Sequence, residues 1–99
     1  MREADYQTHL IKLIENDLLP GAHCFKQDAV AHQGIPDLLV LYGQRWAMLE
    51  VKVSASAPER PNQRYWVQYF NNLSYAAFIF PENEEEVLHG LQLALGALG

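Results

Sequence analysis

The apolar residues of this chain follow two periods, one helical and one typical of strands. From Glu3 to about Leu18 they recur every three or four positions, which predicts an amphipathic helix that Pro20 and Gly21 end. Short runs rich in Val, Leu and aromatic residues predict strands. The expected strands are 23–30, 37–42, 46–53 and 75–80, and further helices are expected at 61–73 and from residue 84. This order, α-β-β-β-α-β-α, predicts an α/β fold with a central mixed four-stranded sheet flanked by helices.

Two of these strands are expected to form a hairpin. Gly43 and Gln44 fit a two-residue loop with glycine in the first position. In that register Asp37 faces Glu50, with their Cβ atoms roughly 5 Å apart. Strand alternation places Lys52 on the same face as Glu50. A three-residue loop would shift the register by one residue, so this pairing depends on the turn.

Charged residues inside apolar strands are the main functional signal. Burying a charge costs several kcal/mol unless a partner compensates it. Two carboxylates that face each other suit a divalent cation, and a lysine beside them suits a phosphate. A solitary Glu-X-Lys is usually a solvated pair and a solitary Pro-Asp is usually a turn, but here they combine across one hairpin. The combination predicts a metal-dependent site at Asp37, Glu50 and Lys52. Gly34, just before it, leaves room for a close backbone approach.

Other segments place candidate residues near this site. Glu3 lies on the inward stripe of the first helix, whereas Glu15 is expected to face solvent. Lys26 in the first strand is expected to point toward the site. Further candidates for contact with a substrate are His32, Gln33, Arg60 and Arg64, and Gln63 lies at the edge of the inward stripe of the second helix.

Composition and charge narrow the class of protein. The 99 residues form one expected domain, 1–99, with 49% hydrophobic and 19% charged residues. Cys24 is the only cysteine, so no internal disulfide is possible and a reducing compartment is expected. No apolar run approaches transmembrane length and the N-terminus has no signal-peptide pattern, which predicts a soluble, cytoplasmic protein without a membrane partner. The net charge of −5 argues against a simple polyanion binder without excluding one.

Two apolar surfaces leave alternatives open. The aromatic residues of the second helix are expected in the core, with a base-stacking platform as the other interpretation. They are Tyr65, Trp66, Tyr69 and Phe70, followed by Leu73. The last helix carries Val87, Leu88, Leu91, Leu95 and Leu98, which fit either intramolecular packing or an interface.

These residues and this element order resemble the PD-(D/E)XK nuclease superfamily, and its VRR-NUC branch in particular, including small stand-alone phage-type members. The matches cover nearly the whole chain. They are Glu3 and Gln7 in the first helix, Lys26, Gly34-Ile35-Pro36-Asp37, Glu50-Val51-Lys52 and Gln63. The resemblance implies a restriction-endonuclease-like fold and hydrolysis of DNA phosphodiesters with Mg²⁺ or Mn²⁺. The acidic net charge and a loop at 54–61 without the glycine-rich, basic character common in the family depart from the pattern.

The resemblance also implies roles for the matched residues. Asp37, Glu50 and the carbonyl of Val51 would hold the cation, and Glu3 would orient a water or help to hold a second ion. Lys52 would position the nucleophile or stabilise developing charge, and Gln63 would align Lys52 or the water.

Substrate and partners are expected by the same resemblance. Small stand-alone members look like homodimers that cleave branched DNA such as four-way junctions, in a bacterial or phage-infected cell. Two alternatives stay open. One is a nuclease without branch preference that acts on single-stranded or duplex DNA, and the other is a non-catalytic nucleic-acid-binding domain of the same fold.

Overall fold

The computed structural model describes residues 1–97. Its helices and strands follow the expected order along the chain. They are α1 (Glu3–Lys12), η1 (Leu13–Leu18), β1 (His23–Lys26), β2 (Leu38–Tyr42), β3 (Arg45–Val51), α2 (Gln63–Leu73), β4 (Tyr75–Ile79), η2 (Pro81–Asn83) and α3 (Glu84–Ala94).

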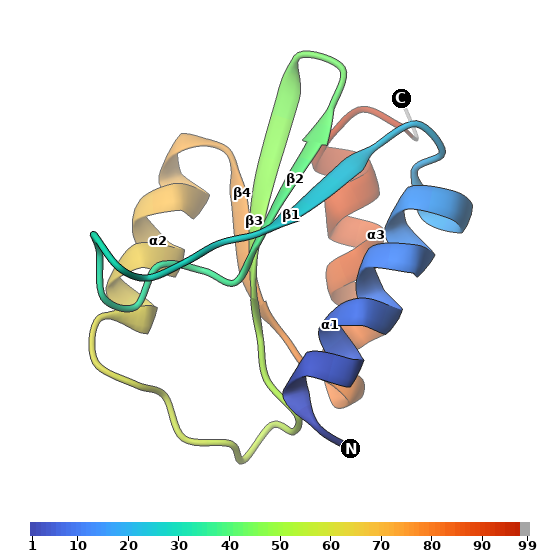
Figure 1. Cartoon of the computed structure of the whole chain (residues 1–99). Coiled ribbons are helices and arrows are strands. Elements are labelled where there is room, and N and C mark those ends of the chain that lie inside the picture. The colour runs from blue at the N-terminus through green and yellow to red at the C-terminus, as the bar shows by residue number, and fades with distance from the viewer. Residues whose placement is uncertain (98–99) are drawn as a thin grey trace.

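One four-stranded sheet, in the order β1-β2-β3-β4, organises the molecule. The first three strands are antiparallel, and β4 runs parallel to β3. In Figure 1, α2 covers one side of the sheet, while α1 and α3 lie side by side on the other. This arrangement confirms the α/β class with a mixed four-stranded sheet between helices.

The β2–β3 hairpin has the predicted register. Tyr42 pairs with Arg45, and Leu38 pairs with Leu49. Gly43 has φ +61°, a left-handed conformation that glycine adopts without the steric cost of a Cβ. The ladder stops at Leu38, so Asp37 lies immediately before β2 instead of inside it. Continuing the register by one residue still sets Asp37 opposite Glu50.

Several elements differ in type or boundary from the sequence-based prediction. The first helix continues through residues 13–18 as a π-helix, in which the N–H of Leu19 donates to the carbonyl of Ile14 at 2.8 Å. Strand β1 ends at Lys26 instead of near Val30, because the chain leaves the sheet in turns that lead back to Asp37. Helix α2 begins at Gln63, two residues later than predicted.

The core has two layers, one on each side of the sheet. The larger joins α1, η1 and α3 to the inner face of the strands, and the smaller joins α2 to Met48 and Ala76. On α3, the side chains of Val87, Leu88, Leu91 and Leu95 are buried in the larger layer. The apolar face of α3 therefore packs within the chain, as one of the two alternatives predicted, and Leu98 lies outside the described residues.

Within residues 1–97, no helix is long and apolar enough to cross a membrane.

Candidate metal-dependent active site

The Glu50 carboxylate lies at the end of β3 with only 1% of the residue exposed. Among residues 1–97, its Oε1 is the one buried side-chain nitrogen or oxygen atom that lacks a hydrogen-bond partner. Asp37 lies beside it and is fixed by the backbone, since its Oδ2 accepts the N–H of Val51 at 2.9 Å. The hairpin thus brings two carboxyl groups together in the way that the register predicted.

This environment strongly favours the protonated form of Glu50. Burial, then hydrogen bonding to Asp37 and the charge of Asp37, raise the pKa of Glu50 to about 10, and the charge of Lys52 offsets part of that rise. The charge of Glu3 adds a smaller upward contribution. A carboxyl group held in this way needs a proton or a cation beside it at neutral pH.

Lys52 is the buried cation of the site. Its residue is 6% exposed, and its Nζ donates to Gln63 Oε1 at 2.6 Å and to the carbonyl of Pro58 at 3.1 Å. Gln63 Oε1 also accepts the N–H of Arg60 at 2.7 Å. The first residue of α2 is therefore hydrogen-bonded to Lys52, and the resemblance implies that Gln63 aligns either Lys52 or the water. The carbonyl of Pro58 was not predicted, because no side-chain pattern reveals a backbone acceptor.

Gly34 permits the contact between the loop before Asp37 and the start of α2. A Cβ on Gly34 would lie 2.6 Å from the carbonyl oxygen of Pro61 and 2.8 Å from the backbone nitrogen of Gln63, and its φ is +87°. Only glycine fits this position without displacing backbone. The close approach predicted for Gly34 thus joins the Asp37 loop directly to Gln63.

Glu3 and Arg60 line hollows around these groups. One hollow is lined by Glu3, Lys52 and Arg60, and a neighbouring one by Asp37, Arg60 and Gln63. Figure 1 shows the start of α1 near the chain that leaves β3. Glu3 therefore faces the site from α1, and Arg60 lies between the two hollows.

A larger hollow at the start of α3 contains none of these groups. It is lined by Glu82, Asn83, Glu85, Glu86 and neighbouring residues. Its size reflects an open surface at the end of the helix, so the site is assigned by its chemistry and not by cavity size.

Other sequence-predicted residues have different positions. Lys26 pairs with Leu38, so strand alternation places it on the face opposite Glu50, where it is exposed. The expectation that Lys26 points toward the site is wrong in this register. Glu15, expected to face solvent, accepts the N–H of Cys24 at 2.8 Å and is only partly exposed. The π-helical turn changes the angular position of residues after Lys12, which explains the difference.

His32 and Gln33 contact Trp66 of α2, whereas Gln33 and Arg64 line two different hollows beside the site. The carbonyl of Gln33 accepts the indole N–H of Trp66 at 3.1 Å, and the His32 ring packs edge-on against that indole. Arg64 is paired with Glu59 and lies over the Phe78 ring, in a hollow that Lys52 also lines. Arg64 thus shares a hollow with Lys52 but not with Asp37.

The aromatic stripe of α2 is only partly in the core, which corrects the first interpretation of these residues. Trp66 and Phe70 are half-buried, whereas Tyr65 is 59% exposed, Tyr69 44% and Leu73 61%. The buried face of α2 is centred on Gln63 and Val67 instead. At about 100° per residue, Gln63 and Val67 lie beyond one edge of the arc that the five large apolar residues cover, so the sheet buries only the near edge of that arc.

The donor set suits a hard divalent cation. The unpartnered oxygen of Glu50 and the neighbouring Asp37 carboxylate are oxygen ligands of the type that Mg²⁺ and Mn²⁺ accept. Within residues 1–97, no group of three or more His, Cys, Asp or Glu side chains is arranged to hold a metal ion. The residues therefore fit a site with two carboxylates that a backbone carbonyl, water or substrate would complete.

Comparison with known proteins adds no family assignment, since no family model, curated protein or solved structure matches this chain.

Proposed function

We propose that this chain is a divalent-metal-dependent DNA endonuclease of the PD-(D/E)XK type, built on a restriction-endonuclease-like fold. The observation that carries the proposal is the buried, unpartnered Oε1 of Glu50 beside Asp37, with Lys52 fixed next to them. A chain gains no stability from burying two acids side by side, so a ligand with positive charge accounts for them best.

Asp37, Glu50 and the carbonyl of Val51 are the proposed ligands of Mg²⁺ or Mn²⁺. When bound, the ion would lower the pKa of a water molecule and neutralise charge on the scissile phosphate. Asp37 is held in place for this role by the N–H of Val51. Glu50 approaches from the facing strand, so the hairpin fixes the separation of the two carboxylates before any ligand arrives.

Lys52 is proposed to bind the scissile phosphate. An ammonium group has three N–H donors, and two of those of Lys52 are used by Gln63 and Pro58. The third can meet a non-bridging phosphate oxygen, where it stabilises the charge that develops during attack. Because Gln63 also accepts the Arg60 N–H, the donor is held in one orientation before the substrate binds.

Glu3 and Arg60 complete the proposed site from two other elements. The carboxylate of Glu3 can accept a proton from the attacking water or help to hold a second ion. Arg60 lines both the hollow that contains Glu3 and the hollow that contains Asp37, and its guanidinium could bind a flanking phosphate there.

A preference for branched DNA and a homodimeric working unit belong to the same proposal. One protomer with net charge −5 has few cations for phosphate contacts, which dominate affinity for nucleic acid. Two protomers double those contacts and bring two active sites to the two strands of a symmetric junction.

Cleavage of matched linear, flapped and four-way DNA tests the function. With Mg²⁺ or Mn²⁺ we expect nicks in the four-way substrate, and none in excess chelator. Equal cutting of every substrate would favour the nuclease without branch preference. Binding without cutting in either metal would favour the non-catalytic domain and overturn the proposed activity.

A further inference from the structure

An exposed pair of aromatic rings stands on α2 near the candidate site. Tyr65 is 59% exposed and Tyr69 is 44% exposed. Their ring centroids lie 6.3 Å apart and their planes differ by 16°, so the rings are nearly parallel. Large aromatic residues held at the surface in this way present flat apolar faces to solvent, and we name the two residues the tyrosine pair.

The tyrosine pair is supported by rings beneath it. Trp66 packs edge-on against both, with centroids 5.0 Å from Tyr65 and 5.6 Å from Tyr69, and Phe70 lies 5.3 Å from Tyr69. Trp66 is itself fixed by its hydrogen bond to the carbonyl of Gln33. These contacts restrict the rotamers of the tyrosines, so a ligand that stacks on them loses little side-chain entropy.

The position of the pair relates it to the scissile phosphate. Helix α2 begins at Gln63, which holds Lys52, and Tyr65 and Tyr69 follow two and six residues later. With a rise of about 1.5 Å per residue, Tyr69 lies roughly 9 Å along the helix axis from Gln63. Stacked nucleotides advance about 3.4 Å each along one strand. Measured along the helix axis, the pair is therefore within the span of the first few nucleotides beside a phosphate bound at Lys52. At about 100° per residue the rings lie roughly 120–160° around α2 from Gln63, so the strand would follow the surface of the helix to reach them.

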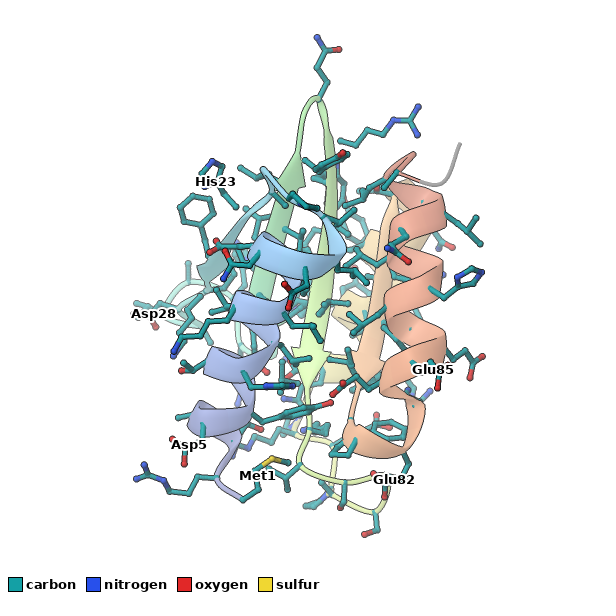
Figure 2. The ribbon with its side chains drawn as sticks, turned by 90° about the vertical axis from the view of Figure 1, so that its right-hand side faces the viewer. Met1, Asp5, His23, Asp28, Glu82 and Glu85 are labelled. Carbon is teal, nitrogen blue, oxygen red and sulfur yellow. The ribbon has the colours of Figure 1, made fainter. Side chains whose placement is uncertain are left out.

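Charge opposes a polyanion less on this side of the sheet than on the other side. Helix α2 contains Arg64 and no acidic residue, although Arg64 is itself paired with Glu59. Eight of the twelve acidic residues belong to the layer on the other side of the sheet, and Figure 2 shows three of them, Asp5, Glu82 and Glu85, on α1, η2 and α3. The eight are Glu3, Asp5, Glu15, Asp17, Glu82, Glu84, Glu85 and Glu86. A DNA strand along α2 thus avoids most of the charge that makes the protein acidic.

We propose that the tyrosine pair is a stacking platform for unpaired bases of the DNA strand whose phosphate lies at Lys52. This inference rests on the proposed function for the position of that phosphate. Bases in a duplex are stacked on one another and present only their edges in the grooves, whereas an unpaired base offers its whole face to an aromatic ring. The platform would direct the enzyme to DNA with unpaired nucleotides next to the cut, such as a flap, a frayed junction or a single strand.

The test compares two double variants in chelator, where no cleavage occurs. Tyr65→Leu with Tyr69→Leu keeps apolar bulk but removes both rings, and Tyr65→Phe with Tyr69→Phe keeps both rings. The probes are a short single strand that carries one fluorescent adenine analogue, and a duplex of the same length. We expect the Leu pair to lose about tenfold or more in affinity for the single strand, together with the fluorescence quenching that stacking causes. The Phe pair should retain both, and duplex binding should be the same in all three proteins.

Three results would overturn the platform. The Leu pair could bind the single strand as tightly as wild type, or it could lose as much affinity for the duplex as for the single strand. It could also show a lower mass than wild type in sedimentation while its DNA binding is unchanged. The last would identify the face as an interface between copies of the chain. Circular dichroism melting of both variants shows whether a loss reflects unfolding, and if the Leu pair is unfolded the single variants Tyr65→Leu and Tyr69→Leu replace it.

The outcome is separable from the proposed function. If wild type cuts DNA with Mg²⁺ but the rings prove irrelevant, only the platform fails. If wild type cuts nothing but the Leu pair loses single-strand binding, the proposed activity fails and the platform stands.

Discussion

Replacing Glu50 by glutamine should stabilise the metal-free protein. The carboxyl group is buried, one of its oxygens has no hydrogen-bond partner, and it lies beside Asp37. A glutamine side chain has almost the same shape but carries no charge, and its amide can donate to Asp37. The substitution therefore removes the cause of instability without creating a cavity.

The size of the effect follows from the pKa of Glu50, which burial and Asp37 raise from 4.5 to about 10. A raised pKa means that the folded protein binds a proton that the unfolded chain releases above about pH 4.5. The contribution of Glu50 to stability is therefore complete below that pH and is lost as the pH rises toward 10. At 1.36 kcal/mol per pH unit, the loss by about pH 7 is at most roughly 3 kcal/mol. Partial relaxation of the site reduces this loss. We therefore expect Glu50→Gln to raise the free energy of unfolding by about 1–3 kcal/mol at about pH 7.

Urea denaturation in chelator across a pH series measures this gain. Wild type should lose stability relative to Glu50→Gln as the pH rises, and the two should converge near pH 4.5. The matched control is Glu85→Gln on the exposed outer face of α3, which should follow wild type. Added Mg²⁺ should raise the stability of wild type and leave Glu50→Gln nearly unchanged, because a ligand stabilises only the state that binds it.

A Glu50→Gln protein less stable than wild type throughout this pH series would refute the reasoning. That result would mean that the carboxylate makes a stabilising structural interaction, for example with Lys52. In the structure the ammonium of Lys52 donates to Gln63 and Pro58, and its charge offsets only part of the rise in the pKa of Glu50.

Three further experiments test the surroundings of the site. Gly34→Ala should lower the free energy of unfolding by about 2 kcal/mol or more and reduce cleavage, because its Cβ would lie 2.6 Å from a backbone oxygen. The control is Gly21→Ala, where φ is +97° and nothing lies within 4 Å of the added Cβ, so it should cost only its backbone strain. Equal losses of stability in urea denaturation would contradict the close contact at Gly34. Gln63→Leu removes an acceptor from the buried Lys52 ammonium and from the part-buried Arg60 N–H, and should lower the free energy of unfolding by about 1–3 kcal/mol and abolish most of the cleavage rate. Full activity would show that Lys52 needs no alignment. Glu3→Gln should lower the cleavage rate with little change in melting temperature. Glu15→Ala removes the acceptor of the Cys24 N–H in β1, so it should lower the melting temperature with little change in cleavage. A loss of cleavage in Glu15→Ala but not in Glu3→Gln would place the helix carboxylate of the site at Glu15.

Local patterns predicted the parts of the fold that local chemistry decides. Gly43 and Gln44 define a tight turn, and a tight turn fixes the register of both strands it joins, so Tyr42 opposite Arg45 followed directly. The resemblance implied that Gln63 aligns Lys52 or the water, and in the structure Gln63 accepts a hydrogen bond from Lys52.

Long-range geometry could not be predicted in the same way. The face on which Lys26 lies depends on the register between β1 and β2, which a long loop joins, and a shift of one residue reverses the face. The five apolar positions of α2 were correctly assigned to a helix, but the sequence does not show which edge of so wide a stripe the sheet covers. Tyr65 and Tyr69 consequently lie at the surface. The π-helical turn after Lys12 has no simple sequence signal, so the partner of Glu15 was not predicted.

The most direct test of the central proposal is a titration of Mn²⁺ into the folded protein, followed by electron paramagnetic resonance of the free ion. Asp37→Asn and Glu50→Gln serve as comparisons, because both keep their shape and lose one charged ligand. We expect saturable binding by wild type, a loss of that binding in both variants, and a parallel loss of DNA cleavage. Binding of Mn²⁺ by both variants with the affinity of wild type would contradict a metal site at Asp37 and Glu50.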